Sequence, residues 1–189
     1  MELLYNMNEK HTVRRPAVFL DRDGVLTEER SYVCSFEEMR IFPYAEECIR
    51  KIKEKGYYAI VITNQSGIAR GLFTEDCLME MNDYLRQVLN VDAIYYCPHH
   101  IEGRVKKYAI TCNCRKPGTG MLEKACRDFN IDMEKSFLAG DRASDIKAGK
   151  NAGIRTVLLE SGYGTARLES NIVPDYICYD LRDMIKILE

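Results

Sequence analysis

The chain has 189 residues, of which 46% are hydrophobic and 30% charged, and its formal net charge is -2. This composition is typical of a soluble globular protein, and the length suits one well-cored domain rather than two. A net charge so near zero gives no general reason to bind nucleic acid or an anionic membrane, so any phosphate affinity must be local. No apolar run approaches the ~18 residues that span a bilayer, and residues 1–10 lack a signal pattern, so we expect a cytoplasmic protein. We expect residues 1–16 to form an irregular tail.

The first predicted strand ends in two carboxylates. The apolar run 17–20 after Pro16 predicts a buried parallel strand, followed by Asp21, Asp23 and Gly24. Ligands bind at this end of the strands in open α/β sheets, and two close carboxylates repel unless a cation or a proton separates them. The acids therefore indicate a cation site, although an Asx-rich turn that closes a strand stays an alternative at this point.

Strands and helices then alternate along the chain. Gly56 ends the first predicted helix, and Thr74 and Asp180 are predicted N-caps of later helices. The alternation predicts an α/β fold, a Rossmann-like parallel sheet with helices on both faces, in a single domain over residues 1–189. The predicted elements are a surface loop at 27–43, helices at 44–55, 75–89, 121–129, around 148–153 and at 181–188, and strands at 57–63, 93–96, 136–139 and 156–159.

Two later strands also end in polar residues. Thr63 opens the run 63–67, whose hydroxyls and backbone N–H groups can cradle an anion, and Asp141 and Asp145 follow the fourth predicted strand. Right-handed crossovers bring the carboxyl ends of parallel strands to one edge of the sheet. Asp21, Thr63 and Asp141 can therefore share one site.

Cysteine and histidine cluster in the middle of the chain. Three of the eight cysteines lie there, and without a signal peptide metal ligation is favoured over disulfides. A Cys₃His set suits tetrahedral zinc and leaves no open position for catalysis, so we expect a structural zinc that staples a loop insertion at 97–114. We expect His99, rather than the adjacent His100, to be the ligand. The candidate ligands form two pairs: Cys97 with His99, and Cys112 with Cys114.

These residues together predict phosphoryl transfer. Carboxylates supply hard oxygen ligands for Mg²⁺, and Thr63 and Lys116 would hold a phosphate against that metal. A carboxylate nucleophile can take the phosphoryl group as an aspartyl-phosphate while a second acid protonates the leaving oxygen. Positioning and charge neutralisation would supply most of the catalysis.

The motifs carry a family resemblance. Asp-Arg-Asp-Gly-Val-Leu at 21–26, Thr63, Lys116 and Gly-Asp-x-x-x-Asp at 140–145 resemble, in this order, the four motifs of haloacid dehalogenase (HAD) superfamily phosphatases. Three further runs resemble the D-glycero-D-manno-heptose 1,7-bisphosphate 7-phosphatases: Thr-Asn-Gln-Ser-Gly-Ile-Ala-Arg-Gly at 63–71, Tyr-Tyr-Cys-Pro-His-His at 95–100 and Cys-x-Cys-Arg-Lys-Pro at 112–117. The likeness runs from about residue 17 to 153 and implies a HAD fold without a large cap domain.

The resemblance also implies roles, with removal of the 7-phosphate as the reaction. Asp21 would be the nucleophile, and Asp23 the general acid and then base. Mg²⁺ would be held by the Asp21 carboxylate, the Asp23 backbone carbonyl and the Asp141 carboxylate, while Thr63 and Lys116 stabilise the phosphoryl group. Asp145 would orient Asp141 or Lys116, and Arg142 stands where these enzymes commonly show lysine. The implied substrate-binding residues are Glu29, Arg30, Ser31, Tyr32, Asn64, Gln65, Ser66, Arg115 and Arg142.

Three alternatives stay open on the sequence. A histidinol-phosphate phosphatase resembles the chain in the catalytic motifs and zinc ligands, but tends to have a shorter loop than residues 100–111. A nucleic-acid 3′-phosphatase shares the catalytic chemistry. A zinc-stabilised nucleic-acid-binding module would leave the acids at two strand ends unexplained, since these would repel a phosphate backbone. We expect a small sugar bisphosphate as the partner, with no nucleic acid and no membrane, and a monomer is compatible with this.

Overall fold

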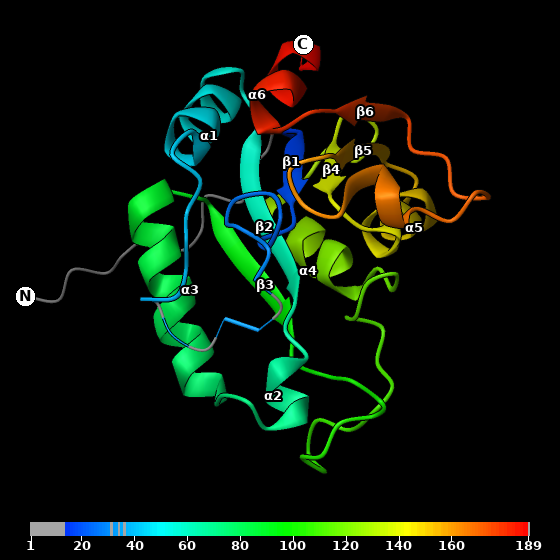
Figure 1. Ribbon diagram of the computed structural model, residues 1–189. Coiled ribbons are helices and arrows are strands. Elements are labelled where there is room, and N and C mark those ends of the chain that lie inside the picture. Colours follow the sequence, from blue (N-terminus) through cyan, green and yellow to red (C-terminus); the bar gives the residue numbers. More distant parts are fainter. Residues whose placement is uncertain (1–13, 31, 34, 36, 189) are drawn as a thin grey trace, which may run out of the picture.

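The computed structural model describes residues 14–30, 32–33, 35 and 37–188, and its centre is an open sheet of six parallel strands (Figure 1). The strand order is β3-β2-β1-β4-β5-β6. The strands are β1 (Ala17–Leu20), β2 (Tyr58–Asn64), β3 (Ala93–Cys97), β4 (Phe137–Gly140), β5 (Arg155–Leu159) and β6 (Tyr176–Cys178). This order confirms the predicted parallel α/β sheet.

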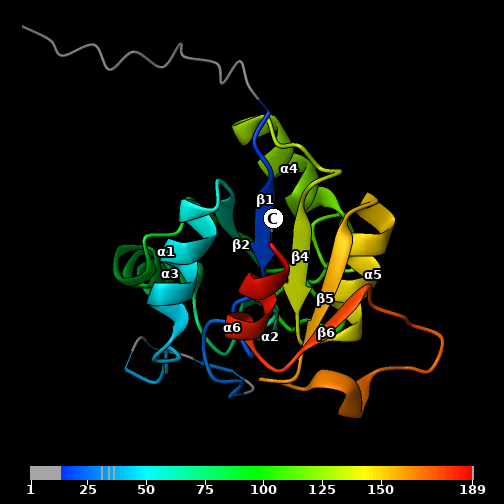
Figure 2. The ribbon, with the colours of Figure 1, turned by 90° about the horizontal axis from the view of Figure 1, so that it is seen from above.

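Helices cover both faces of the sheet (Figure 2). Side chains of α1 (Ala45–Glu54), α3 (Glu75–Leu89) and α6 (Leu181–Met184) join the apolar cluster on one face, and those of α4 (Gly120–Phe129) and α5 (Ala143–Ala152) join the cluster on the other. The short α2 (Gly67–Arg70) follows β2, and two 3₁₀ turns, η1 (Gly164–Arg167) and η2 (Ile185–Ile187), lie in the C-terminal part. The arrangement is the predicted doubly covered sheet.

Strand β1 shows why the sheet needs cover on both sides. Successive side chains of a strand point to opposite faces, and Val18 and Leu20 belong to one apolar cluster while Ala17 and Phe19 belong to the other. All four are fully buried. An all-parallel sheet has this composition because its crossover helices cover both faces.

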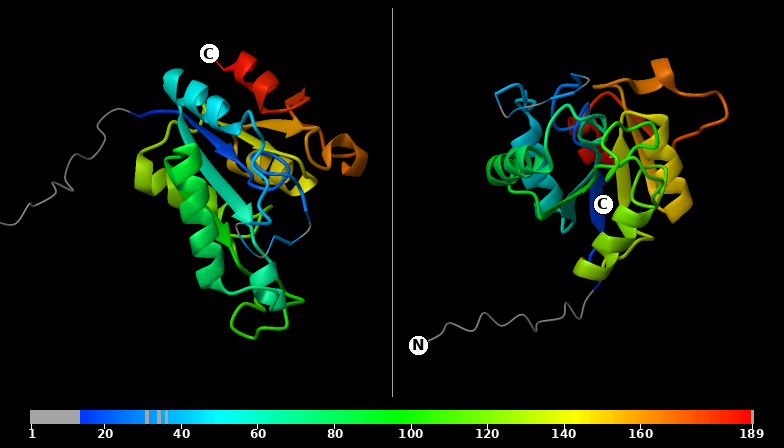
Figure 3. Two further views of the ribbon diagram at one scale, coloured as in Figure 1. Left: turned by 60° about the vertical axis from the view of Figure 1, so that its left-hand side comes forward. Right: turned by 90° about the horizontal axis from the view of Figure 1, so that it is seen from below.

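The order of the strands places a crevice at the end of β1. The chain moves outward from β1 to β3 on one side, then returns to β4 and moves outward to β6 on the other. Ligands of open α/β sheets bind outside the carboxyl ends of the strands at such a reversal. The loop between β3 and α4 extends beyond this end of the sheet, beside α2 (Figure 3).

Most predicted element types and positions agree with the structure, within two residues at each end for the first helices and strands. Thr74 caps α3 as predicted, since its hydroxyl accepts the Cys77 N–H at 3.2 Å. The close packing predicted for α5 rests on Gly149, where a Cβ would lie 2.4 Å from Thr156 Cγ2. The predicted tail falls mostly on residues 1–13, which lie outside the described residues.

Two details of the C-terminal part differ from the prediction. The prediction missed the edge strand β6, because three residues are too few for a periodic pattern to stand out. The final helix, predicted over 181–188, ends as α-helix at Met184 and continues as a 3₁₀ turn. Asp180 caps it as predicted, accepting the Arg182 N–H at 2.8 Å. Across the residues that the structure describes, no helix is both long and apolar enough to cross a membrane.

Helix α3 offers a matched test of the packing. Leu78 is fully buried against the sheet, whereas the next residue, Met79, is 45% exposed. We expect Leu78→Ala to lower the free energy of unfolding by about 2–5 kcal/mol, because it removes buried methyl groups and leaves a cavity. Met79→Ala should change it by no more than about 0.5 kcal/mol. Urea titrations of the two variants measure the difference, and equal losses would contradict this packing.

Candidate active site

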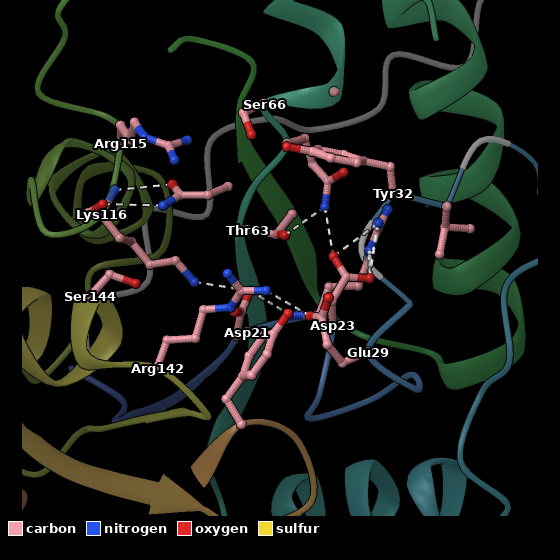
Figure 4. Close-up of a pocket in the computed structure, with 16 residues that line it drawn as sticks. Asp21, Asp23, Glu29, Tyr32, Thr63, Ser66, Arg115, Lys116, Arg142 and Ser144 are labelled. Atoms are coloured by element: carbon pink, nitrogen blue, oxygen red, sulfur yellow. Dashed lines mark hydrogen bonds and ion pairs between the residues drawn. The ribbon is translucent and has the colours of Figure 1, made fainter. Parts of the chain in front are cut away.

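A buried lysine ammonium joins two of the predicted acids at the carboxyl edge of the sheet. Lys116 Nζ lies 2.9 Å from Asp21 Oδ1 and 2.7 Å from Asp145 Oδ1, and it donates to the Ile62 carbonyl at 2.8 Å. The Lys116 side chain is only 2% exposed. Figure 4 shows it reaching down to Asp21. The ammonium therefore connects β1, β2 and α5 at one point.

Asn64 fixes the backbone of that lysine. The Lys116 N–H donates to Asn64 Oδ1 at 3.0 Å, and Asn64 Nδ2 donates back to the Lys116 carbonyl at 3.1 Å. This reciprocal pair attaches the segment after the cysteine cluster to the end of β2. Asn64, predicted to bind substrate, therefore acts on the backbone of Lys116 in this structure.

Asp141 is the third acid, and its surroundings differ from those of Asp21. Its Oδ2 accepts the Tyr163 N–H at 2.9 Å, but its buried Oδ1 has no hydrogen-bond partner among the described residues. Glycine makes room for the carboxylate from two sides: a Cβ at Gly24 would lie 2.4 Å from Asp141 Oδ2, and one at Gly162 2.1 Å. The carboxylate is thus closely packed without a full set of protein partners.

The electrostatics of these acids favour a cation. Burial raises the pKa of Asp141 to about 7, and the charges of Asp21 and Asp145 act in the same direction. Burial also raises the pKa of Asp21 to about 6, although Lys116 opposes this. One oxygen from each of the three carboxylates lies within 4.8 Å of the others. Since Lys116 already pairs with Asp145, the carboxylates of Asp21 and Asp141 are the ones that fit a hard divalent cation, which would favour their ionised forms.

Asp23 is held by hydrogen bonds on both oxygens. Arg22 donates to it from Nε and Nη2, each at 3.0 Å, and Thr27 Oγ1 donates at 3.2 Å. Gln65 Nε2 donates both to Asp23 at 2.9 Å and to Thr63 Oγ1 at 2.9 Å. Burial opposes ionisation, but these partners together hold the pKa of Asp23 below its ordinary value. The structure therefore presents Asp23 as a carboxylate.

Arg22 is a functional residue that the sequence analysis missed. Its side chain is 1% exposed, and its guanidinium forms an ion pair with the neighbouring Asp23. An arginine in a charged Asp-Arg-Asp run is expected to point to solvent, so the sequence carried no signal for its burial.

Asp21 and Asp23 line a pocket of about 270 Å³, whereas Asp141 and Asp145 are buried beneath it and are not among the lining residues (Figure 4). The predicted substrate residues that line it are Glu29, Tyr32, Asn64, Gln65, Ser66, Arg115 and Arg142. Arg30 is not among the lining residues, since its guanidinium pairs with Glu28 at 3.2 Å and is about half exposed. Ser31 lies outside the described residues.

Arg142 reaches across one side of the pocket. Its Nη2 pairs with Glu29 Oε2 at 2.9 Å, and its guanidinium lies over the Tyr163 ring at 4.3 Å. Tyr163 lines the pocket and was also missed by the sequence analysis, because it lies beyond residue 153, where the resemblance ends. Its position in the turn after a predicted strand, at the same edge as the acids, was the available signal.

The predicted zinc ligands come together beside the pocket. The sulfur atoms of Cys97, Cys112 and Cys114 lie 3.1–3.5 Å apart. His99 Nδ1 lies 3.7 Å from the first of these sulfurs and 3.4 Å from the last. The three cysteines are free, and four soft ligand atoms at such separations fit a tetrahedral metal. His100 lies outside this set and contacts Arg70 instead.

The chain is similar to several bacterial phosphatases over most of its length. A family model described as HAD-hydrolase-like matches residues 113–184. A D-glycero-beta-D-manno-heptose-1,7-bisphosphate 7-phosphatase of Pasteurella multocida is 37% identical, covering 93% of this chain and 97% of the relative. A D-glycero-alpha-D-manno-heptose-1,7-bisphosphate 7-phosphatase of Photorhabdus laumondii is 42% identical, covering 82% of this chain and 88% of the relative.

A solved structure agrees with these relatives. The D,D-heptose 1,7-bisphosphate phosphatase of B. bronchiseptica, crystallised with magnesium and phosphate, superposes with a TM-score of 0.79 at 31% identity. The superposition covers 90% of this chain and 96% of that protein. The chain thus belongs to the D-glycero-D-manno-heptose 1,7-bisphosphate 7-phosphatase family of HAD-like phosphatases.

Proposed function

We propose that this phosphatase removes the 7-phosphate of a D-glycero-D-manno-heptose 1,7-bisphosphate, with Mg²⁺ as the catalytic ion and zinc as a structural one. The observation that carries the proposal is the buried Lys116 between Asp21 and Asp145, beside an Asp141 oxygen that has no hydrogen-bond partner among the described residues. Family relatives that bear this name support the choice of substrate. The names include enzymes for the alpha and for the beta anomer, so the proposal specifies the heptose bisphosphate without choosing between its anomers.

Asp21 is the proposed nucleophile. The hydrogen bonds that the described residues make to it, from the Arg22 N–H at 2.8 Å and from Lys116, both go to Oδ1. Its other oxygen is then available to attack phosphorus and form the aspartyl-phosphate. Lys116 and Thr63, which line the pocket beside it, would neutralise the phosphoryl oxygens as they accumulate charge.

Asp23 is the proposed proton donor and acceptor. As the acid it would protonate the leaving sugar oxygen, and as the base it would then take a proton from the attacking water. Arg22 and Gln65 hold its carboxylate toward the pocket, the latter also orienting the Thr63 hydroxyl. The lowered pKa of Asp23 favours the ionised form, which is the one required for the hydrolytic step.

The metal would bind among the strand-end acids. Asp21 and Asp141 supply carboxylates, and the Asp23 carbonyl is the third proposed ligand. When bound, Mg²⁺ would neutralise phosphate charge and hold the phosphoryl group in line with the nucleophile. The carboxylate geometry and the magnesium-bound solved relative support this assignment.

The remaining pocket residues would select the sugar. Arg115 stands next to Lys116, and Figure 4 shows the two side chains running in different directions. If Lys116 faces the phosphoryl group under attack, Arg115 can bind the end of the sugar that bears the second phosphate. Glu29, Tyr32 and Arg142 would close the other side.

The loop 97–114 acts as a zinc-binding insertion in this proposal, within a single phosphatase domain. The named relatives favour the heptose substrate over histidinol phosphate, whose ammonium group Arg115 would repel. A nucleic-acid 3′-phosphatase has no support among them.

The nucleophile gives the first test. Asp21→Asn keeps the size of the side chain but removes the attacking oxygen and one metal charge, so turnover should be abolished while the melting temperature stays unchanged. Asp83→Asn, at an exposed position of α3, is the control and should keep full activity. Phosphate release from the bisphosphate with Mg²⁺ measures both. Turnover of Asp21→Asn within tenfold of wild type would refute the assignment.

The metal cluster gives the second test. Cys112→Ser should lower bound zinc from about one ion per chain and make the loop 97–114 sensitive to protease, because metal binding supplies the folding free energy of such a loop. Cys77→Ser, outside the cluster, should keep its zinc. Elemental analysis and limited proteolysis give the readouts. Unchanged zinc and protease resistance in Cys112→Ser would argue against the site.

Substrate choice gives the third test. Arg115→Ala should lower kcat/KM for the bisphosphate by an amount that corresponds to a loss of about 1.5–3 kcal/mol of transition-state stabilisation, the strength of a charged hydrogen bond. It should hardly change kcat/KM for a simple aryl monophosphate. Arg127→Ala, exposed on α4, is the matched control. Similar losses on both substrates, or a wild-type preference for histidinol phosphate, would contradict the heptose assignment while leaving the phosphatase intact.

A further inference from the structure

Helix α2 ends against the proposed zinc-binding loop, and backbone hydrogen bonds join the two segments. The N–H groups of Arg104 and Val105 both donate to the Ala69 carbonyl, at 2.7 and 2.9 Å. Gly103 allows this approach, because a Cβ there would lie 2.8 Å from the same carbonyl oxygen. The left panel of Figure 3 shows the helix and the loop side by side. The position of the next residue, Arg70, is therefore set from both segments.

Arg70 contacts the ring of His100, whose other nitrogen already has a donor of its own. Arg70 Nη2 lies 3.4 Å from His100 Nε2, while the other ring nitrogen, Nδ1, accepts the Glu102 N–H at 3.2 Å. A neutral imidazole has one acceptor nitrogen, so its two ring nitrogens cannot accept both contacts at once. In the tautomer in which Nδ1 accepts from Glu102, Nε2 carries a hydrogen and faces the Arg70 donor. An acceptor placed against both would remove the conflict.

The rest of the Arg70 guanidinium is also poorly paired. Its Nε is buried without a hydrogen-bond partner in the described part of the chain. Glu102 Oε2 is 3.9 Å from Nη2, but that side chain is 76% exposed, and such an ion pair adds little in water. Donors that are buried and unpaired cost free energy unless a ligand or a water satisfies them.

Arg70 is the last residue of the helix that begins at the pocket, and neither Arg70 nor His100 is itself among the pocket-lining residues. Ser66 and Gly67, which open the same short helix, line the pocket, as does Arg115. Arg115 is tied to the loop through its contact with the His99 carbonyl at 3.3 Å. The Arg115 guanidinium therefore lies against the backbone that leads into His100, the residue that Arg70 contacts. Neighbouring cations of this kind favour an anion between them.

We propose that Arg70 and His100 bind, together with Arg115, the phosphate of the substrate that is not hydrolysed. The inference rests on the proposed function, since it assigns two further specificity-determining residues to the same pocket. One phosphate oxygen would accept from Arg70 Nη2 and His100 Nε2–H, and others would accept from Arg115. The zinc-stapled loop would then serve recognition, because it holds His100 against the end of α2.

The test compares two sugars that differ only in this phosphate. Arg70→Gln should lower kcat/KM for heptose 1,7-bisphosphate by about 10- to 100-fold, and change it less than about threefold for heptose 7-phosphate. Lys106→Gln, which removes an exposed cation of the same loop, should leave both unchanged. Arg70→Lys should lose part of the preference, because an ammonium lacks the planar pair of donors. Equal losses on both sugars would overturn the proposal.

Binding without turnover separates the two proposals. In the Asp21→Asn background, calorimetry should show bisphosphate bound with Mg²⁺, and addition of Arg70→Gln should raise Kd about 10-fold or more. Equal Kd values would refute the role of Arg70 and leave the phosphatase proposal standing, whereas no bisphosphate binding to Asp21→Asn would refute the substrate itself. If Arg70→Gln loses zinc, the same comparison with His100→Phe decides, and an unchanged preference there would overturn the inference.

Discussion

The ion pairs of Lys116 are the interactions on which the site depends. Asp21 and Asp145 bring two negative charges to a buried edge of the sheet, which is costly without a cation between them. Burial opposes the charge on Lys116, but Asp145 and Asp21 together raise its pKa, so the ammonium is retained. Removing it would leave both carboxylates uncompensated. One side chain therefore holds together the ends of β1 and β2 and the first turn of α5.

The three acids of the cluster differ in how far the protein itself neutralises them. Lys116 and the Arg142 N–H occupy Asp145, the latter at 3.0 Å, so this carboxylate is committed to the protein. Among the described residues, Asp141 receives the Tyr163 N–H and a distant Arg142 Nε at 3.9 Å. Asp21 lies between the two environments. The protein neutralises one side of the cluster itself and leaves the other to a cation, which explains how three acids coexist at one buried edge.

The sequence predicted the sheet and the main acids well because those signals are local. Apolar runs marked β1, β2 and β4, and the polar residues after each run marked one edge of the sheet. The roles of Arg22 and Tyr163 depend instead on tertiary contacts, namely burial against Asp23 and the turn that cradles Asp141. Spacing likewise placed Asn64 in the pocket but could not show that its amide holds the Lys116 backbone. What the sequence could not supply was the partner of each polar side chain.

The loop 97–114, the proposed zinc-binding segment, connects the catalytic residues to the substrate pocket, because one of its ends and its middle lead to different sets of cations. At one end, the last cysteine is followed directly by Arg115 and Lys116, so the metal ligands fix where both cations begin. In its middle, the loop docks on α2 and brings His100 to Arg70. A polar loop of this length buries little apolar area of its own, so it needs a metal to hold one shape. If the proposed assignments hold, Lys116 and the residues for the second phosphate lie on one segment held by the metal, and the loop rather than the sheet sets the distance between the two phosphate sites.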